Sequence, residues 1–168
     1  MKCIWRILLS IACIGFLTYG CEAKDTTETI TDRNIPVTDV MDFYYTYENI
    51  NYNAFYQRYR FYVEDGKYMF HHETREIPDG YGWTTEEDIT KEGTFALKEK
   101  ELQEFWTLLK NGEVSARSDS TETGDAGPWM YIYWKGDKGK YQVFDFPSYE
   151  ARVDFEQFCE QLSNSRGN

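Results

Sequence analysis

Apolar and polar residues alternate in the stretch after residue 39, which predicts β-strands. Between Val40 and Tyr47, every second residue from Phe43 onward is aromatic, as in a strand with one buried face. The clearest pattern spans residues 54–63, where one face is apolar and the other mixes tyrosine with arginine. The two faces are Phe55, Tyr59, Phe61 and Val63, and Tyr56, Arg58, Arg60 and Tyr62.

Asp65-Gly66 follows this strand and predicts a tight hairpin, because both positions of such a turn require positive φ. The return strand is expected from Lys67 to about Arg75. A loop with Pro78-Asp79-Gly80 comes next, and then a short strand over residues 93–97.

Two later segments have the spacing of amphipathic helices. The first covers residues 98–110 and ends at Asn111-Gly112, a common helix stop. The second begins after Ser148, the expected N-cap. Their apolar stripes are Leu102, Phe105, Trp106 and Leu109, and Ala151, Phe155, Phe158 and Leu162.

Residues 129–134 and 140–146, which lie between the helices, predict two more strands joined by a glycine-containing turn. The expected order is therefore ββββ-α-ββ-α. Hairpins imply a mainly antiparallel sheet of about six strands, with the two helices packed on one face. We predict a single α+β domain over residues 39–168.

The first 20 residues differ from the rest of the chain. They contain Lys2 and Arg6, no acid, and an apolar run over residues 7–19, which is the layout of a secretory signal peptide. The run is shorter than the roughly 20 apolar residues of a membrane-spanning helix. We therefore expect residues 1–20 to be removed.

Cys21 follows Leu17-Thr18-Tyr19-Gly20. This resembles the lipobox of bacterial lipoproteins, and the resemblance implies a lipidated Cys21 that holds the chain to a membrane on the extracytoplasmic side of the cell envelope. Cys13, after Ser10-Ile11-Ala12, is a rival position inside the apolar run. A plain signal peptide or an uncleaved anchor is the simpler alternative.

Residues 21–38 are mostly polar and predict a flexible tether. Loss of residues 1–20 removes two bases and no acid, so the net charge moves from −11 to −13. Such a charge repels phosphate backbones, which excludes nucleic acid as a partner class. It also repels anionic headgroups, so membrane attachment depends on the lipid at Cys21.

The segments with candidate chemistry have simpler structural interpretations. His71-His72 on one strand point to opposite faces and cannot easily chelate one metal ion. Residues 119–125 resemble a calcium loop, but position twelve is Met130 where an EF-hand has glutamate. Cys159 lies at the edge of an apolar stripe and is expected to be a small buried hydrophobe. We therefore predict no catalytic residue, metal or cofactor.

Aromatic residues give the strongest indication of a binding surface. Helices on one face of a sheet leave the other face open, and there aromatic planes beside polar groups suit a glycan, a peptide or a protein. Trp129, Tyr131 and Tyr133 share one strand face. The candidate ligand-binding residues are Tyr56, Arg58, Arg60, Tyr62, Tyr81 and Trp83.

Three functional hypotheses follow. The first is a membrane-anchored, non-enzymatic binding or interaction module. The second is a hydrolase acting on an envelope or dietary polymer, which requires two suitably spaced acids. The third is an inhibitor or immunity-type protein that docks on a basic partner through its negative charge. The layout of residues 40–162 also resembles a class of uncharacterised small secreted bacterial domains, which supports the fold and implies no activity.

Overall fold

The computed structural model describes residues 29–30, 33–117, 127–136 and 141–166 of the 168-residue chain. Two short 3-10 helices, η1 (Val37–Asp39) and η2 (Glu86–Asp88), precede the strands β3 and β6. The helices are α1 (Glu99–Leu109) and α2 (Tyr149–Arg166). The strands are β1 (Thr29–Ile30), β2 (Ile35–Pro36), β3 (Val40–Asn49), β4 (Ala54–Glu64), β5 (Lys67–Ile77), β6 (Ile89–Ala96), β7 (Glu113–Ser115), β8 (Trp129–Trp134) and β9 (Gln142–Asp145).

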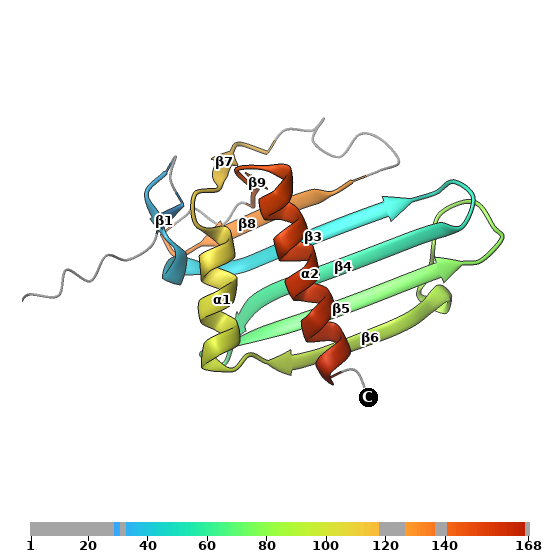
Figure 1. Cartoon of the computed structure of the whole chain (residues 1–168), viewed down its shortest axis with the longest axis horizontal. Coiled ribbons are helices and arrows are strands. Elements are labelled where there is room, and N and C mark those ends of the chain that lie inside the picture. Colours follow the sequence, from blue (N-terminus) through green and yellow to red (C-terminus); the bar gives the residue numbers. More distant parts are fainter. Residues whose placement is uncertain (1–28, 31–32, 118–126, 137–140, 167–168) are drawn as a thin grey trace, which may run out of the picture.

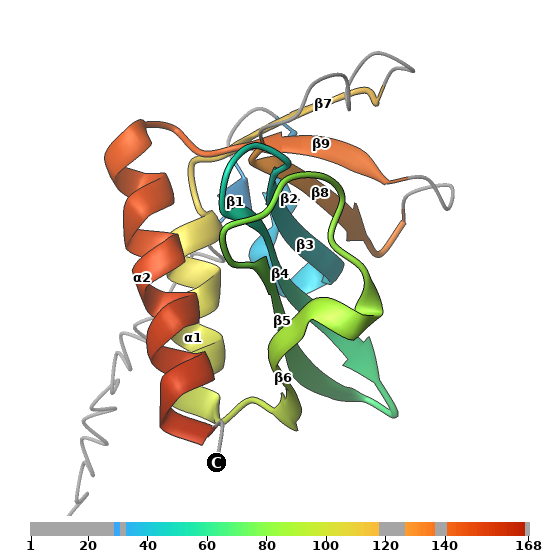
Figure 2. The same ribbon diagram turned by 90° about the vertical axis from the view of Figure 1, so that its right-hand side faces the viewer.

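Seven strands form one antiparallel sheet in the order β6-β5-β4-β3-β8-β9-β7 (Figure 1). Both helices lie in a second layer against one face of this sheet (Figure 2). The predicted α+β class, with a mainly antiparallel sheet and two helices, is therefore confirmed. Within the described residues, the other face of the sheet carries no α-helix, and it is called the open face below.

The predicted number of strands is wrong by one in this sheet. The additional strand is β7, which pairs with β9 and lies between the first predicted helix and the strand predicted over residues 129–134. Its three residues contain one apolar side chain, Val114, which is buried. Alternation cannot be recognised over so short a stretch. The strand predicted over residues 93–97 also begins earlier, at Ile89.

The β4–β5 hairpin has the predicted turn. Asp65 and Gly66 have φ values of 50° and 72°, as a two-residue hairpin turn requires. Strand pairing then continues without a break from Glu64 and Lys67 to Ala54 and Ile77. This long hairpin lies inside the sheet, between β6 and the central strand β3.

Aromatic side chains fill the space between the sheet and the helices. Phe43 in β3 lies in the centre, with ring centroids 5.2 Å from Phe144 and 5.4 Å from Phe155. Phe61 of β4 stacks on Phe105 of α1 at 4.0 Å. The predicted apolar stripes of both helices therefore face the sheet, because Phe105, Leu109, Phe155 and Leu162 are buried in this core.

The predicted tether of residues 21–38 extends too far toward the C-terminus. β1 pairs with β2 in a small separate ribbon, and Ile30, Ile35 and Val37 are buried in the main core. These β-branched residues are scattered among polar ones. The composition of the whole segment is therefore polar and does not indicate that single residues are buried. Residues 29–30 and 33–38 therefore belong to the folded domain, while the rest of the predicted tether lies outside the described residues.

Candidate functional site

The predicted tyrosines and arginines of β4 lie on the open face. Tyr62 and Tyr133 are both aligned with Asp42 of β3, so the β8 aromatics share this face with the β4 set. This common face follows from register, because residues directly opposite each other in a sheet point the same way. Alternation within each strand predicted each set of side chains, whereas the register places the two sets on one face of the sheet.

Arginine and tyrosine alternate in a row across the open face. Arg58 lies 5.7 Å from the ring centroids of both Tyr44 and Tyr56. The contacts continue outward on both sides, with Arg75 at 4.9 Å from Tyr56 and Tyr131 at 5.0 Å from Tyr44. Each such contact between a guanidinium and a ring is attractive. The arginine–tyrosine row consists of Arg75, Tyr56, Arg58, Tyr44, Tyr131 and Arg117.

A hollow of about 300 Å³ lies over the middle of this row. Its size is at the small end of ligand pockets in general. Aromatic walls surround a few polar groups, which is the usual composition of a small-molecule site. The lining residues are Tyr44, Thr46, Glu48, Tyr56, Arg58, Trp83, Trp129 and Tyr131.

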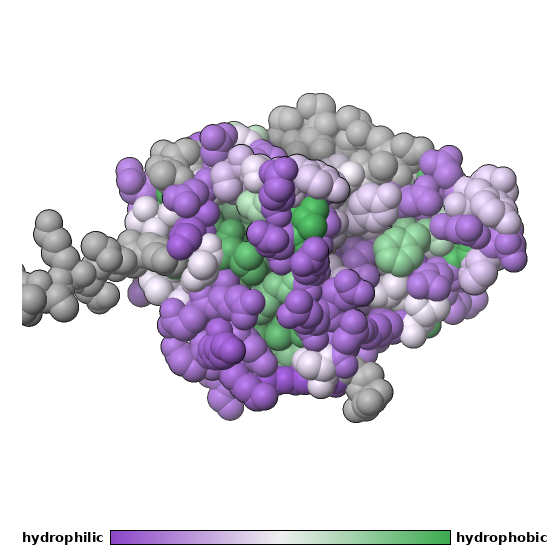
Figure 3. All heavy atoms as spheres, in the orientation of Figure 1, coloured by the Kyte–Doolittle hydropathy of each residue, from purple (hydrophilic) through white to green (hydrophobic). Residues whose placement is uncertain are grey.

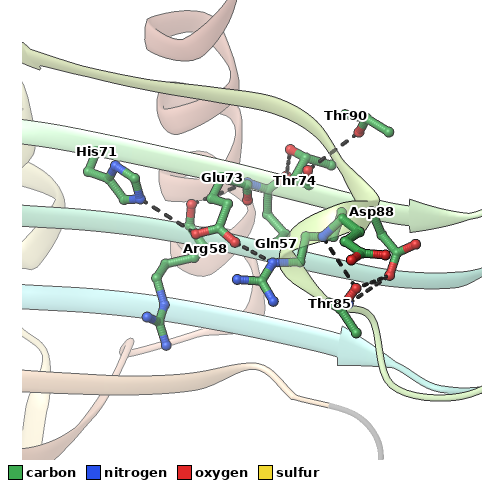
Figure 4. Close-up of polar contacts among 10 residues, drawn as sticks. Gln57, Arg58, His71, Glu73, Thr74, Thr85, Asp88 and Thr90 are labelled. Carbon is green, nitrogen blue, oxygen red and sulfur yellow. Dashed lines mark hydrogen bonds and ion pairs between the residues drawn. The ribbon is translucent and has the colours of Figure 1, made fainter.

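Arg58 has no polar partner at the bottom of this hollow. Its Nε is buried without a hydrogen bond, and no ion pair of its guanidinium is found in the described part of the chain. Figure 4 shows the side chain reaching over β3 with no dashed contact at its guanidinium. The Thr46 hydroxyl, on a residue 8% exposed, is likewise buried without a partner among described residues. Unsatisfied groups of this kind cost free energy unless a ligand pairs with them.

Neighbouring arginines on the same face are paired. Arg60 donates to both oxygens of Asp42, at 3.0 Å from Nε to Oδ1 and 2.5 Å from Nη2 to Oδ2. The hydrogen bonds to Asp42 raise the pKa of the Arg60 guanidinium. Arg75 pairs with Glu73, which also lies near His71 (Figure 4). Arg58 is thus the arginine of β4 that stays available to a ligand.

Among the described residues that line the hollow, Glu48 has the one acidic side chain. Its carboxylate forms no hydrogen bond within the described ranges. Burial raises the pKa of Glu48, while the charge of Arg75 acts in the opposite direction. Burial also raises the pKa of Tyr56, which stands beside it in the β3–β4 register. The hollow therefore offers one cation, one anion and a buried hydroxyl.

Trp83 forms the rim of the hollow from the loop between β5 and β6. The Gly82 amide donates to the Ile50 carbonyl at 2.9 Å, which ties the loop to the β3–β4 turn. On the other side, Thr85 and Asp88 cap η2, with a distance of 2.7 Å from Thr85 N to Asp88 Oδ2 (Figure 4). The indole is 62% exposed although its backbone is fixed on both sides.

The six predicted binding residues do not all meet at one place. Tyr56, Arg58 and Trp83 line the hollow. Arg60 lines a neighbouring hollow of about 220 Å³ with Tyr44, Arg58 and Tyr141. Tyr62 lies under Arg60, at 4.6 Å, and outside both hollows.

Tyr81 points elsewhere. It is 71% exposed and packs on Tyr52 with ring centroids 5.5 Å apart. Its proximity to Trp83 in sequence suggested a common site. Gly82 between them has a positive φ of 109°, which breaks the extended conformation that would place both side chains on one side. Tyr44, Thr46 and Glu48 were missed, although they are the positions of β3 that alternate with Phe43, Tyr45 and Tyr47, which face the core.

A larger hollow, of about 460 Å³, lies on the other side of the sheet beside α2. Figure 3 shows this helix-bearing side, where apolar surface gathers along the seam between the helices. Polar groups around the hollow already have partners: the Tyr45 hydroxyl donates to Glu156 at 2.7 Å, and Lys91 Nζ donates to Ser163 Oγ at 3.2 Å. Its polar groups are therefore less available to a ligand than those of the open-face hollow.

The other sequence candidates do not form a site. His72 is buried and His71 lies on the open face, so they point to opposite sides as predicted. Burial raises the pKa of the Cys159 thiol, which makes it a poor nucleophile. The described residues contain no cluster of three or more His, Cys, Asp or Glu side chains that could hold a metal. The calcium-like segment 119–125 lies outside them.

Comparisons of the chain with protein families, curated proteins and solved structures give no match. Within the described residues, neither helix has the length and apolarity needed to cross a membrane. Cys21 lies outside those residues. Any assignment of function therefore rests on the open-face hollow and on the sequence pattern around Cys21.

Proposed function

We propose that this chain is a non-enzymatic binding module that is held at the cell envelope by a lipidated Cys21 and takes its ligand in the open-face hollow. The observation that carries the binding role is Arg58, whose Nε is buried without a hydrogen bond at the bottom of an aromatic-walled hollow. A bound ligand supplies the missing acceptor and recovers that cost.

Binding without catalysis is favoured over hydrolysis by the groups present. Acid-catalysed hydrolysis of a glycosidic bond uses two carboxyl groups about 5–10 Å apart. Among the described lining residues, Glu48 is the one carboxylate of the hollow. The neighbouring Asp42 already accepts hydrogen bonds from Arg60 and Tyr141, at 2.7 Å from the Tyr141 hydroxyl.

Trp83→Ala tests the binding site. The full chain, produced in a bacterium, is screened on glycan and peptide arrays, and the affinity for each retained ligand is measured by calorimetry. Loss of the exposed rim should lower affinity at least tenfold, because a hot-spot aromatic is worth 2 kcal/mol or more. The melting temperature should stay within a few degrees, since Trp83 is 62% exposed.

Tyr149→Ala is the matched control for this experiment. Tyr149 is 67% exposed and opens α2, in the layer on the opposite side of the sheet. This variant should bind as the wild type does. Unchanged binding by Trp83→Ala would refute the open-face site, whatever the ligand.

A further inference from the structure

From the charges and hydroxyls of the open-face hollow we infer that its ligand is a neutral saccharide. This inference rests on the proposed function, since it names the class of ligand for the same site. It depends on Arg58 Nε and the Thr46 hydroxyl, which are buried without a hydrogen bond within the described ranges, and on Glu48, which lines the same hollow.

The charges of the hollow balance each other. Two other acids of the open face, Asp42 and Glu73, are paired with Arg60 and Arg75 and do not line the hollow. Arg58 and Glu48 then remain as one cation and one anion in the same small space. A ligand with a net negative charge would gain from Arg58 but be repelled by Glu48, and a cationic ligand would meet the reverse.

Hydroxyl groups suit both charges at once. Each hydroxyl donates one hydrogen bond and accepts others, so neighbouring hydroxyls of a sugar can accept from Arg58 and donate to Glu48. The Thr46 hydroxyl can take either role. Hydrogen bonds to charged groups are stronger than those between neutral groups. A sugar hydroxyl that accepts from Arg58 also gives its buried Nε the acceptor that it lacks.

The walls of the hollow suit the other side of a sugar ring. Trp83 and Trp129 present indole rings at its edge, and Tyr44 and Tyr56 lie beside Arg58. The negative face of an aromatic ring attracts the weakly positive C–H groups of a pyranose. A volume of about 300 Å³ fits a small unit of one or two rings.

Glu48→Gln separates a neutral from an anionic ligand by the sign of its effect. The substitution keeps the shape of the side chain. With a neutral saccharide, loss of a charged acceptor should weaken binding about tenfold, by the usual strength of such a hydrogen bond. With a carboxylate or sulfate ligand, loss of the repulsion should strengthen binding.

The experiment uses the full chain on an array of neutral and acidic glycans, with calorimetry of the retained ones at 50 mM and 500 mM NaCl. We expect neutral glycans to be retained, with affinity that changes less than twofold with salt. Arg58→Lys, which keeps the charge but loses the planar pair of donors, should weaken binding at least tenfold. Arg152→Gln on α2 is the control and should bind normally.

The possible results are distinct. Retention of neutral glycans, weakened by both Glu48→Gln and Arg58→Lys, supports the inference. Binding of acidic glycans alone, with higher affinity in Glu48→Gln and lower affinity in high salt, overturns the inference but leaves the proposed binding role intact. The same conclusion follows if only peptides bind and Trp83→Ala abolishes their binding. Retention of no glycan also overturns it. Should Arg58→Lys fail to fold, Glu48→Gln decides alone.

Discussion

At the scale of single residues, His72 is a buried histidine without a partner. Its side chain is 1% exposed, and neither ring nitrogen forms a hydrogen bond within the described part of the chain. Gly93 is its neighbour in β6, and a Cβ there would come within 2.6 Å of His72 Nε2, so glycine leaves the room that the imidazole occupies. Burial, followed by the charge of Lys91, lowers the pKa of His72 to about 4.

This pKa predicts loss of stability in mild acid. The contribution of neutral His72 is fully present above pH 6.5 and is lost as the pH falls toward 4, because the unfolded chain takes up a proton that the folded chain excludes. The shift corresponds to about 3 kcal/mol. The free energy of unfolding, measured with urea, should therefore fall between pH 7 and pH 4.5 by about 2 kcal/mol more in wild type than in His72→Leu.

A comparison with His71→Gln identifies the histidine responsible. His71 lies on the open face, with Nδ1 2.9 Å from Thr94 Oγ1, and its replacement should leave the acid-induced decrease as in wild type. Equal decreases in wild type and His72→Leu would mean that burial of His72 has no part in the pH dependence.

At the scale of elements, the β1–β2 ribbon closes one end of the core. Ile30 is 0% exposed, although it lies in a two-residue strand. Ile30→Ala should lower the free energy of unfolding by about 3 kcal/mol, as for other buried isoleucines. Thr38→Ala, at an exposed position of the same segment, should change it by less than about 0.5 kcal/mol. Chemical denaturation of both variants checks this, and a stable Ile30→Ala would indicate that the ribbon does not contribute.

The elements predicted best from the sequence are those whose patterns are long. β4 extends over 11 residues that alternate for most of their length, and its turn at Asp65 and Gly66 matches the expected geometry. The Ser148 hydroxyl caps α2 by accepting from the Ala151 amide at 3.2 Å, also as predicted. β1, β2 and β7 were missed because strands of two or three residues carry no periodic signal.

The candidate site was predicted in part for a similar reason. Alternation places Tyr56 and Arg58 on one face without knowledge of the fold. Grouping them with Thr46 and Trp129 requires the register across β4, β3 and β8. Arg60 has an acidic partner and Arg58 has none among the described residues. This difference also depends on the register, so the pattern of one strand could not distinguish them.

At the scale of the whole molecule, the proposed anchor can be tested independently of the ligand. Wild type and Cys21→Ala are expressed in a bacterium and analysed by detergent phase partitioning and intact mass. Wild type should enter the detergent phase with the mass of residues 21–168 plus lipid. Cys21→Ala should lose the lipid and stay in the aqueous phase, because its charge does not favour anionic membranes. Equal partitioning, or an unlipidated wild type, would refute lipidation at Cys21.

The length of β3 determines where the hollow would lie on an anchored protein. β3 begins at Val40, next to the N-terminal ribbon, and Thr46 in the hollow lies six residues further along. At about 3.3 Å per residue, this separates the two by about 20 Å. A chain held from its N-terminal side could therefore carry the hollow on its outward end. The hollow could then bind one segment of a long polymer, while the rest of the polymer stays away from the bilayer.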